Sequence, residues 1–218
     1  MESTWASKKS GLGLRLCLAF LGILFFYSGC LAQSAQVKDE TITYFGSGKV
    51  KVRLYTDYFC VPCRAVEPRI EGLMKSLVKK NMININFIDA PFHKFSSMYA
   101  RYFLFILNEN RNFEYALSAR EILFEAAKEN VTEVDKLEEY LKKKGIKFIP
   151  FDVRPVFVAL ERSLREDNIN ATPTCVIERD GKKEMFKGGD DIAKALEGLN
   201  GGRLPGDKKP ATSEEKKK

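Results

Sequence analysis

The 218-residue sequence predicts an α/β domain that is interrupted by a long helical insertion. Two segments, 50–56 and 82–90, alternate apolar and polar residues with the period of a strand, and 61–80 between them has the spacing of a helix. Residues 92–167 have helical patterns only, and 174–189 have the pattern of a hairpin with an Asp-Gly turn. The first two strands, joined through a helix, are expected to be parallel, and the hairpin adds antiparallel strands to the same sheet.

The first strand ends directly before the stretch DYFCVPC, residues 57–63. Apolar residues then recur at three- and four-residue steps, which predicts a helix, and Pro68 within it predicts a kink. The cysteines Cys60 and Cys63 are therefore expected at the point where a strand ends and a helix begins.

The insertion is predicted to contain four helices. Residues 96–110 are apolar nearly all round, as expected of a buried helix. Segments 112–130 and 132–145 are amphipathic, and a fourth helix over 152–168 is expected to start near Pro155.

These patterns divide the chain into parts. Residues 41–91 and 168–200 form the predicted α/β domain, and 92–167 form the insertion. The last helix of the domain begins at Asp190. Residues 201–218 are rich in Gly, Pro, Lys and Glu, which predicts a disordered tail.

The N-terminus has the parts of an export signal. Residues 1–29 contain a basic head, a run of twelve apolar residues, which is short for a transmembrane helix, and a small-residue exit. The exit resembles a bacterial lipobox ending at Cys30, so we expect lipidation of Cys30, cleavage shortly after it, or retention as an uncleaved membrane anchor. Each outcome places the domain, after a linker over 30–40, in the periplasm or at the outer face of a bacterial membrane.

The formal charge of +7 does not indicate a nucleic-acid partner. Residues 203–218 carry a surplus of +3 and the residues before Cys30 carry +2, which leaves only +2 on the domain. Because the domain has no basic stripe interleaved with aromatic residues, we exclude nucleic-acid binding.

The position of the cysteine pair favours redox chemistry. At a helix N-terminus, unpaired N–H groups and the helix dipole favour the thiolate of Cys60. The pKa of such a cysteine falls from about 8.5 into roughly the 3.5 to 7.5 range, which makes it a nucleophile at neutral pH. Cys63, one turn further along, is more shielded and suited to resolve a mixed disulfide on Cys60. No bound cofactor is required for this reaction.

Other uses of the pair remain open. Cys60, Cys63, Cys175 and His93 supply enough ligands for a metal, but their spacing matches no compact zinc motif, and we assign no metal ligand. A structural disulfide across so short a loop would remove little chain entropy. We therefore favour catalysis over a metal carrier or a non-catalytic binding module. Cys175 is expected to be a buried, inert thiol and His93 a structural or surface residue.

The motifs resemble a known family. YTDYFCVPC before a helix, DAPFHKFS before a helical block, and ATPT before a strand, turn, strand and helix resemble the thioredoxin-fold thiol-disulfide oxidoreductases of the DsbA-like branch, which are bacterial and exported. The resemblance spans about 41–200 and implies a thioredoxin-like fold with the insertion between the second strand and the cis-proline strand. It implies that Cys60 attacks, that Cys63 resolves, and that Val61 and Pro62 tune the reduction potential.

The resemblance also implies a substrate site. Pro173 matches the family's cis-proline beside the dithiol, and Thr172 would offer backbone groups to a substrate peptide that lies as an extra strand. Tyr58, Phe59 and Val61 would form an apolar rim for flexible substrate chains. The expected partners are exported proteins with thiols or disulfides and a membrane redox partner.

Two departures from the family leave the mechanism partly open. Some relatives carry a buried acid six residues before the first cysteine, where this chain has Leu54, so water, Glu67 or Asp57 must handle protons. The dipeptide between the cysteines lacks the histidine of strong oxidants, and its proline resembles reducing thioredoxins. A periplasmic reductant, for example in haem-protein maturation, is the alternative to a disulfide donor.

Overall fold

The computed structural model describes residues 41–201. The predicted signal, the linker with Cys30 and residues 202–218 of the predicted tail lie outside the described residues. The strands are β1 (Tyr44–Phe45), β2 (Val50–Thr56), β3 (Ile83–Asp89), β4 (Thr174–Arg179) and β5 (Lys182–Lys187). The helices are α2 (Val61–Lys79), α3 (Ser96–Glu109), α4 (Phe113–Lys128), α5 (Val134–Lys143), α6 (Arg154–Glu166) and α7 (Gly189–Asn200).

The strands form one mixed sheet in the order β1-β3-β2-β4-β5. β2 and β3 are parallel, and the β4–β5 hairpin extends the sheet antiparallel to β2, as the sequence predicts. The hairpin turns at Asp180 and Gly181, which both have positive φ. β1 was not predicted, because its two residues are too few to give an alternating pattern. The α/β class and its helical insertion are confirmed.

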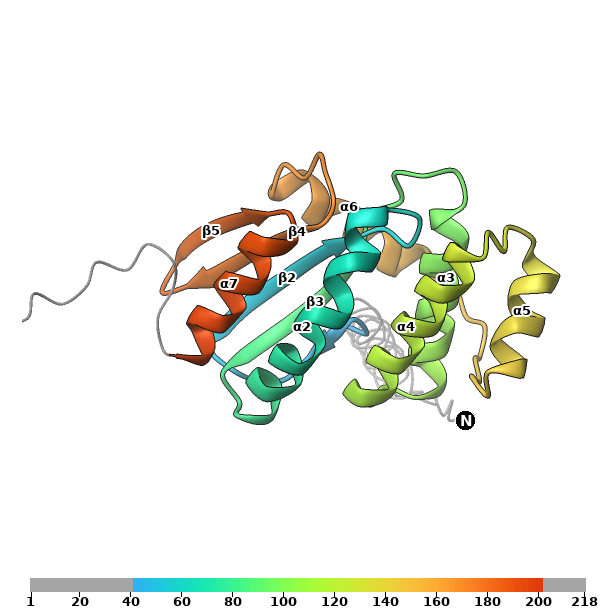
Figure 1. Cartoon of the computed structure of the whole chain (residues 1–218), viewed down its shortest axis with the longest axis horizontal. Coiled ribbons are helices and arrows are strands. Elements are labelled where there is room, and N and C mark those ends of the chain that lie inside the picture. Colours follow the sequence, from blue (N-terminus) through green and yellow to red (C-terminus); the bar gives the residue numbers. More distant parts are fainter. Residues whose placement is uncertain (1–40, 202–218) are drawn as a thin grey trace, which may run out of the picture. The chain divides into compact units, whose positions relative to one another are not determined.

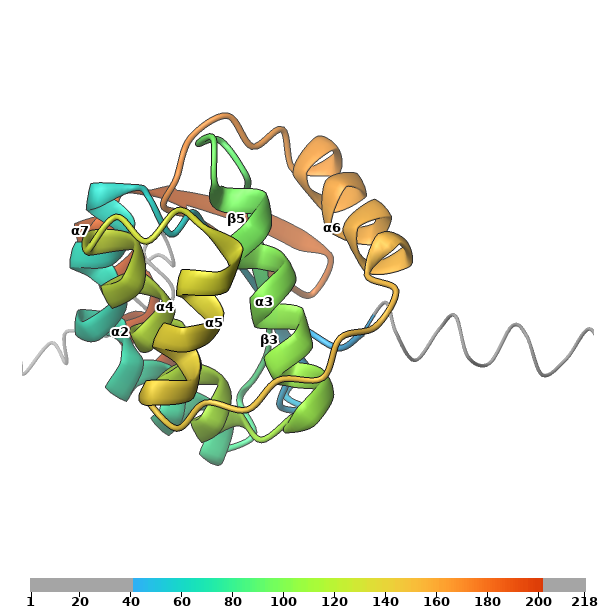
Figure 2. The same ribbon diagram turned by 90° about the vertical axis from the view of Figure 1, so that its right-hand side faces the viewer.

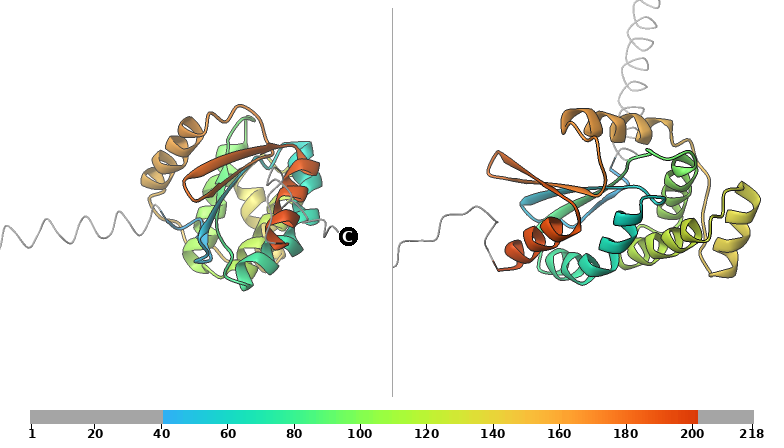
Figure 3. Two further views of the ribbon diagram at one scale, coloured as in Figure 1. Left: turned by 90° about the vertical axis from the view of Figure 1, so that its left-hand side faces the viewer. Right: turned by 45° about the horizontal axis from the view of Figure 1, so that its top comes forward.

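Helices cover both faces of the sheet (Figures 1 and 2). α2 and α7 pack against each other on one face, whereas α6, from the insertion, lies on the opposite face, as the two further views in Figure 3 show. The remaining helices of the insertion, α3, α4 and α5, form a cluster at one side of the sheet, where α4 contacts α2. Among the helices of residues 41–201, none is long and apolar enough to cross a membrane.

The helix α2 carries the cysteine pair toward the core. Pro62 lies in its first turn, where a missing N–H costs nothing and the fixed φ suits a helix. The periodic apolar residues turn one face inward, and this buried face includes Cys63. α2 continues through Pro68 as a single helix, and the kink remains a prediction. The dithiol is thereby fixed to a rigid element at the carboxyl end of the central strand β2.

Candidate active site

Cys60 is the N-cap residue of α2. Its backbone is extended, and its Sγ accepts a hydrogen bond of 3.3 Å from the backbone N–H of Cys63. The Cys63 thiol also donates to Cys60 Sγ, with the two sulfur atoms 2.7 Å apart. Cys60 is 6% exposed and Cys63 is fully buried. Cys60 Sγ thus accepts two hydrogen bonds from Cys63, the residue that is expected to resolve a mixed disulfide on Cys60.

These contacts separate the acidities of the two thiols. The hydrogen bond from the Cys63 thiol, opposed by burial and aided by the backbone N–H, lowers the pKa of Cys60 to about 6. Burial raises the pKa of Cys63 strongly, and its bond to Cys60 raises it further. At neutral pH the pair therefore holds one thiolate, on Cys60, and one proton, on Cys63.

Thr172 and Pro173 lie directly against the dithiol. The Thr172–Pro173 peptide bond is cis, and the Thr172 carbonyl oxygen is 3.3 Å from Cys60 Sγ. β4 begins at the next residue and pairs antiparallel with β2. Residues far apart in the sequence, at the end of one strand and the start of another, thus meet at one sulfur atom.

The surface around Cys60 is apolar but differs from the predicted rim. Val61 is 64% exposed, Pro62 is exposed, and Phe59 is half-buried. The prediction that Tyr58 belongs to the rim is wrong, because this side chain is 1% exposed. Its ring packs between two aromatic rings at centroid distances of 4.8 and 5.6 Å, and its hydroxyl lies 3.4 Å from a buried carboxylate, so it faces the core.

The structure adds one aromatic residue, Phe95, to this surface and exposes a second, Phe92, in the same loop. Phe95 packs against Phe59 with ring centroids 6.0 Å apart, and Phe92, in the same loop, is 49% exposed. Both belong to the APFHKF stretch, whose density of apolar residues between a strand and a helix is a signal that sequence reasoning could have used. We call Phe59, Val61, Pro62 and Phe95 the apolar rim.

Asp57 connects the dithiol loop to that same stretch. Its side chain is completely buried, and its Oδ1 accepts from the backbone N–H of Phe59 (2.8 Å) and the hydroxyl of Ser96 (2.7 Å). Its Oδ2 accepts from the backbone N–H groups of Phe92 (2.9 Å) and His93 (3.2 Å). The imidazole Nδ1 of His93 lies 3.0 Å from the same oxygen. The expectation of a structural or surface histidine omitted this contact.

Glu67, the other candidate proton carrier, belongs to a buried ion cluster. Arg120, from α4, is 0% exposed and donates through Nε to Glu67 (2.5 Å), through Nη1 to Asp89 (3.3 Å) and through Nη2 to the Thr56 hydroxyl (2.8 Å). We call these four residues, with Tyr58 against Asp89, the Arg120 cluster. Sequence reasoning missed it, although an arginine on the apolar face of an amphipathic helix is a recognisable signal.

The family is shown by comparison of the sequence with family models. The sequence matches the thioredoxin family model over residues 41–195, which is most of the chain. The chain belongs to the thioredoxin family. A search of curated proteins finds no match. The thioredoxin-like fold predicted from the motifs is therefore confirmed.

Solved structures agree on the fold. A periplasmic thioredoxin-like protein from Salmonella enterica serovar Typhimurium has 20% identity and a TM-score of 0.54, covering 72% of this chain and 92% of that one. Wolbachia pipientis alpha-DsbA1 has 14% identity and a TM-score of 0.57, with 73% and 91% covered. The catalytic domain of Proteus mirabilis ScsC has 16% identity and a TM-score of 0.54, with 76% and 97% covered. The fold of this thioredoxin-family protein is thus DsbA-like.

Cys175 lies in β4, two residues after Pro173. It pairs across β2 and β4 with Leu54, the residue at the position where some relatives carry an acid. Cys175 is fully buried, and burial raises its pKa to about 12. The thiol therefore stays protonated at neutral pH, as expected of an inert packing residue. Within residues 41–201, no three His, Cys, Asp or Glu side chains gather as a metal site.

Proposed function

We propose that this protein is a thiol-disulfide oxidoreductase that exchanges disulfides with exported proteins through Cys60 and Cys63. The observation that carries the proposal is the asymmetry of the pair, with both donors of Cys63 directed at Cys60 and the pKa of Cys60 lowered to about 6. A nucleophile must be a thiolate at working pH, and a resolving thiol must wait until its partner is in a mixed disulfide.

The reaction is a two-electron exchange. The Cys60 thiolate attacks a substrate disulfide, the substrate S–S bond breaks, one substrate sulfur leaves as a thiolate, and the other joins Cys60. Cys63 then attacks Cys60 Sγ, and its proton passes through water to a released substrate thiolate; the second substrate sulfur leaves and a Cys60–Cys63 disulfide remains. The substrate is reduced and the protein oxidised, and the reverse sequence donates the disulfide to a substrate dithiol.

The surroundings of the dithiol suit a flexible peptide. A substrate strand that pairs with the backbone at Thr172, beside Pro173, would bring its sulfur toward Cys60 Sγ. The apolar rim, which includes Val61 and Pro62, would contact apolar side chains of that strand. The chemistry needs no bound cofactor, because electrons pass between sulfur atoms and return through a membrane redox partner. We propose that it takes place in the periplasm or at the outer membrane face, with Cys30 as a lipid attachment point.

Mutant trapping tests whether the pair is catalytic. In cells that make the Cys63→Ala variant, we expect mixed disulfides between Cys60 and exported proteins, detectable as thiol-sensitive bands on non-reducing gels. The Cys60→Ala and Cys63→Ala double variant should lose these bands, and the Cys175→Ala variant should behave like the unchanged protein. Absence of trapped substrates would favour a non-catalytic module, and stoichiometric metal in the reduced protein would favour a metal carrier.

The direction of electron flow is tested by the reduction potential. Equilibration of the purified full chain with glutathione buffers should give a value near about −120 mV for a disulfide donor and near about −270 mV for a reductant. The Val61–Pro62 dipeptide, which lacks histidine, favours the lower value, so a periplasmic reductant is the second candidate function.

A further inference from the structure

Asp57 in the dithiol loop and His93 in the loop between β3 and α3 form an acid–imidazole pair that has no assigned role in the exchange steps above. Asp57 lies three residues before Cys60, and its backbone carbonyl accepts the Cys60 N–H at 3.0 Å. Its buried carboxylate contacts His93 Nδ1 at 3.0 Å, while the imidazole is half exposed to solvent. An ionisable group that solvent can reach is thus joined through one hydrogen bond to a buried group beside the nucleophile.

The carboxylate acts against the nucleophile. A negative charge near a thiolate disfavours that thiolate, and Asp57 accordingly pushes the pKa of Cys60 upward, against the hydrogen bonds from Cys63 that lower it. A carboxylate paired with an imidazolium has a much weaker field than a carboxylate paired with a neutral ring. Histidine is the side chain whose ordinary charge change falls between about pH 5 and 8.

We propose that His93 is a positioning residue for the redox reaction, which sets the thiolate fraction of Cys60 through Asp57 according to whether its imidazole carries a proton. This inference rests on the function proposed above. Protonation of His93 partly neutralises Asp57 and favours the Cys60 thiolate. By reciprocity, a thiolate on Cys60 favours the proton on His93, whereas a Cys60–Cys63 disulfide, which has no charge, does not.

Other charged groups near Asp57 and His93 also affect the local field. Asp89 interacts electrostatically with Asp57, and it also contacts Arg120 and Tyr58. Arg120 in turn contacts Glu67, and Lys94 follows His93 in the sequence. Arg120 is held by Glu67 and Asp89 and is permanently charged. The pKa of Asp89 is raised to about 6, mainly by burial, so Asp89 also titrates in the relevant range. A test must therefore observe the ring of His93 itself.

The sequence makes this observation direct, because His93 is its only histidine. We would follow the imidazole Cε1–H resonance of the full chain by NMR from pH 4.5 to 9, in the reduced and the oxidised form. The titration midpoint of the ring should lie higher in the reduced form by about 0.5 pH unit or more. In Cys60→Ser, which cannot form the thiolate, the ring should titrate as in the oxidised protein.

Two variants at neighbouring exposed residues measure the effect of His93 on the thiolate of Cys60. His93→Gln should raise the pH at which the thiolate absorbance at 240 nm appears and remove one inflection from the pH dependence of the reduction potential. Lys94→Gln removes a neighbouring charge that does not contact Asp57, so any shift it causes should be the same at every pH.

The outcomes separate this inference from the function on which it rests. If Cys60 and Cys63 form no reversible disulfide, the proposed function fails. If the disulfide forms but the His93 midpoint is identical in both redox states, only the role of His93 is overturned. A histidine that merely held the loop would have the same midpoint in both redox states, and His93→Gln would leave the inflection in the pH dependence of the reduction potential unchanged.

Discussion

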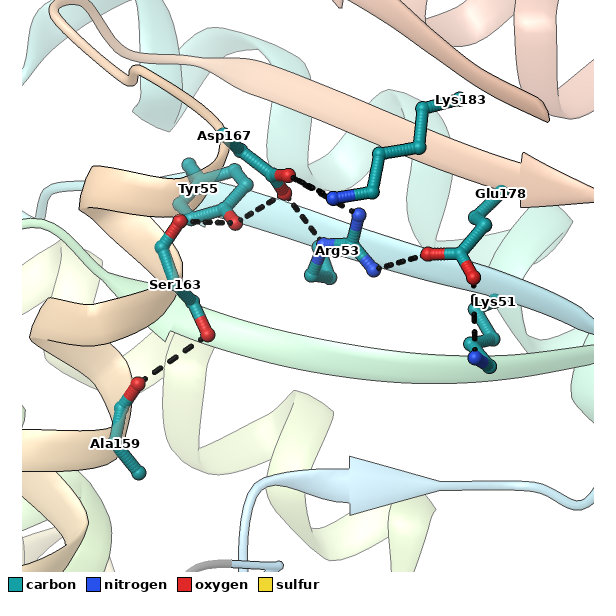
Figure 4. A network of polar contacts seen from close by, with 8 residues as sticks. All are labelled: Lys51, Arg53, Tyr55, Ala159, Ser163, Asp167, Glu178 and Lys183. Atoms are coloured by element: carbon teal, nitrogen blue, oxygen red, sulfur yellow. Dashed lines mark hydrogen bonds and ion pairs between the residues drawn. The ribbon is translucent and has the colours of Figure 1, made fainter. Parts of the chain in front are cut away.

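Two neighbouring residues of β2, Tyr55 and Thr56, belong to ion clusters on opposite faces of the sheet. Thr56 contacts the Arg120 cluster on the face that carries α2. Tyr55 contacts Asp167 at the end of α6, in a network that Figure 4 draws. We call this second network the Arg53 cluster, and its members are Arg53, Tyr55, Asp167, Glu178, Lys183 and Lys51. Both clusters attach a helix of the insertion to the sheet.

The pKa of Asp89, in the Arg120 cluster, and that of Asp167, in the Arg53 cluster, are shifted in opposite directions. Burial raises the pKa of Asp89 to about 6, because the single contact with Arg120 and the long contact with Tyr58 do not compensate for it. Burial also acts on Asp167, but bonds from Arg53 (2.5 Å), Lys183 (2.9 Å) and Tyr55 (2.7 Å) hold its pKa below the usual range. The number and quality of donors, rather than burial alone, decides whether a buried carboxylate favours its charge.

The largest difference between the clusters should appear when each loses its arginine. Arg120→Met leaves two buried carboxylates without a cation, in a setting where the guanidinium also lies 4.4 Å from the ring centroid of Phe87. We expect a loss of about 3 to 5 kcal/mol in the free energy of unfolding, measured by urea denaturation. Arg165→Met, which removes an exposed helical arginine, is the control and should cost well under about 1 kcal/mol. A loss as small as the control's would mean that Glu67 and Asp89 do not need Arg120.

The next effect concerns pH. The pKa of Asp89 is raised from 3.8 to about 6, so the folded state binds this proton more tightly than the unfolded state, and stability falls as pH rises from about 4 to 6. The shift corresponds to roughly 2 to 3 kcal/mol. Asp89→Asn should remove that part of the pH dependence, as seen from unfolding free energies at pH 4, 5, 6 and 7. Parallel curves for the two proteins would show that Asp89 is not the titrating group.

The Arg53 cluster should respond more weakly and with the opposite pH sign. Arg53→Met leaves Asp167 with Tyr55 and Lys183, so we expect a loss of about 1 to 2 kcal/mol at pH 7. Because the pKa of Asp167 is lowered, its stabilising effect is complete above its unfolded pKa and is lost as pH falls through the folded value. The destabilisation by Arg53→Met should therefore shrink in acid, and an effect that grew in acid would contradict it.

The contrast between the clusters also marks the limit of sequence reasoning. The position of Cys60 and Cys63 was predictable, because the change from strand to helix period is a local signal around them. Arg120 meets Glu67, Asp89 and Thr56 across separations of 53, 31 and 64 residues, so no local pattern names its partners. The prediction that Tyr58 belongs to the rim was wrong for the same reason, because the burial of Tyr58 depends on long-range packing.

The smallest effect tests whether the Arg53 cluster behaves as one network. Lys51 bonds Glu178 at 3.1 Å, but its side chain is 63% exposed, so the pair is screened by solvent. Lys51→Met should change the unfolding free energy by less than about 0.5 kcal/mol, and the change should disappear at high salt. Urea denaturation at low and high salt measures both. If Lys51→Met instead lowered the unfolding free energy as much as Arg53→Met, the exposed charge of Lys51 would support Asp167 through Glu178 and Arg53. The stability of the cluster would then depend on the full series of charges rather than on the three donors at Asp167.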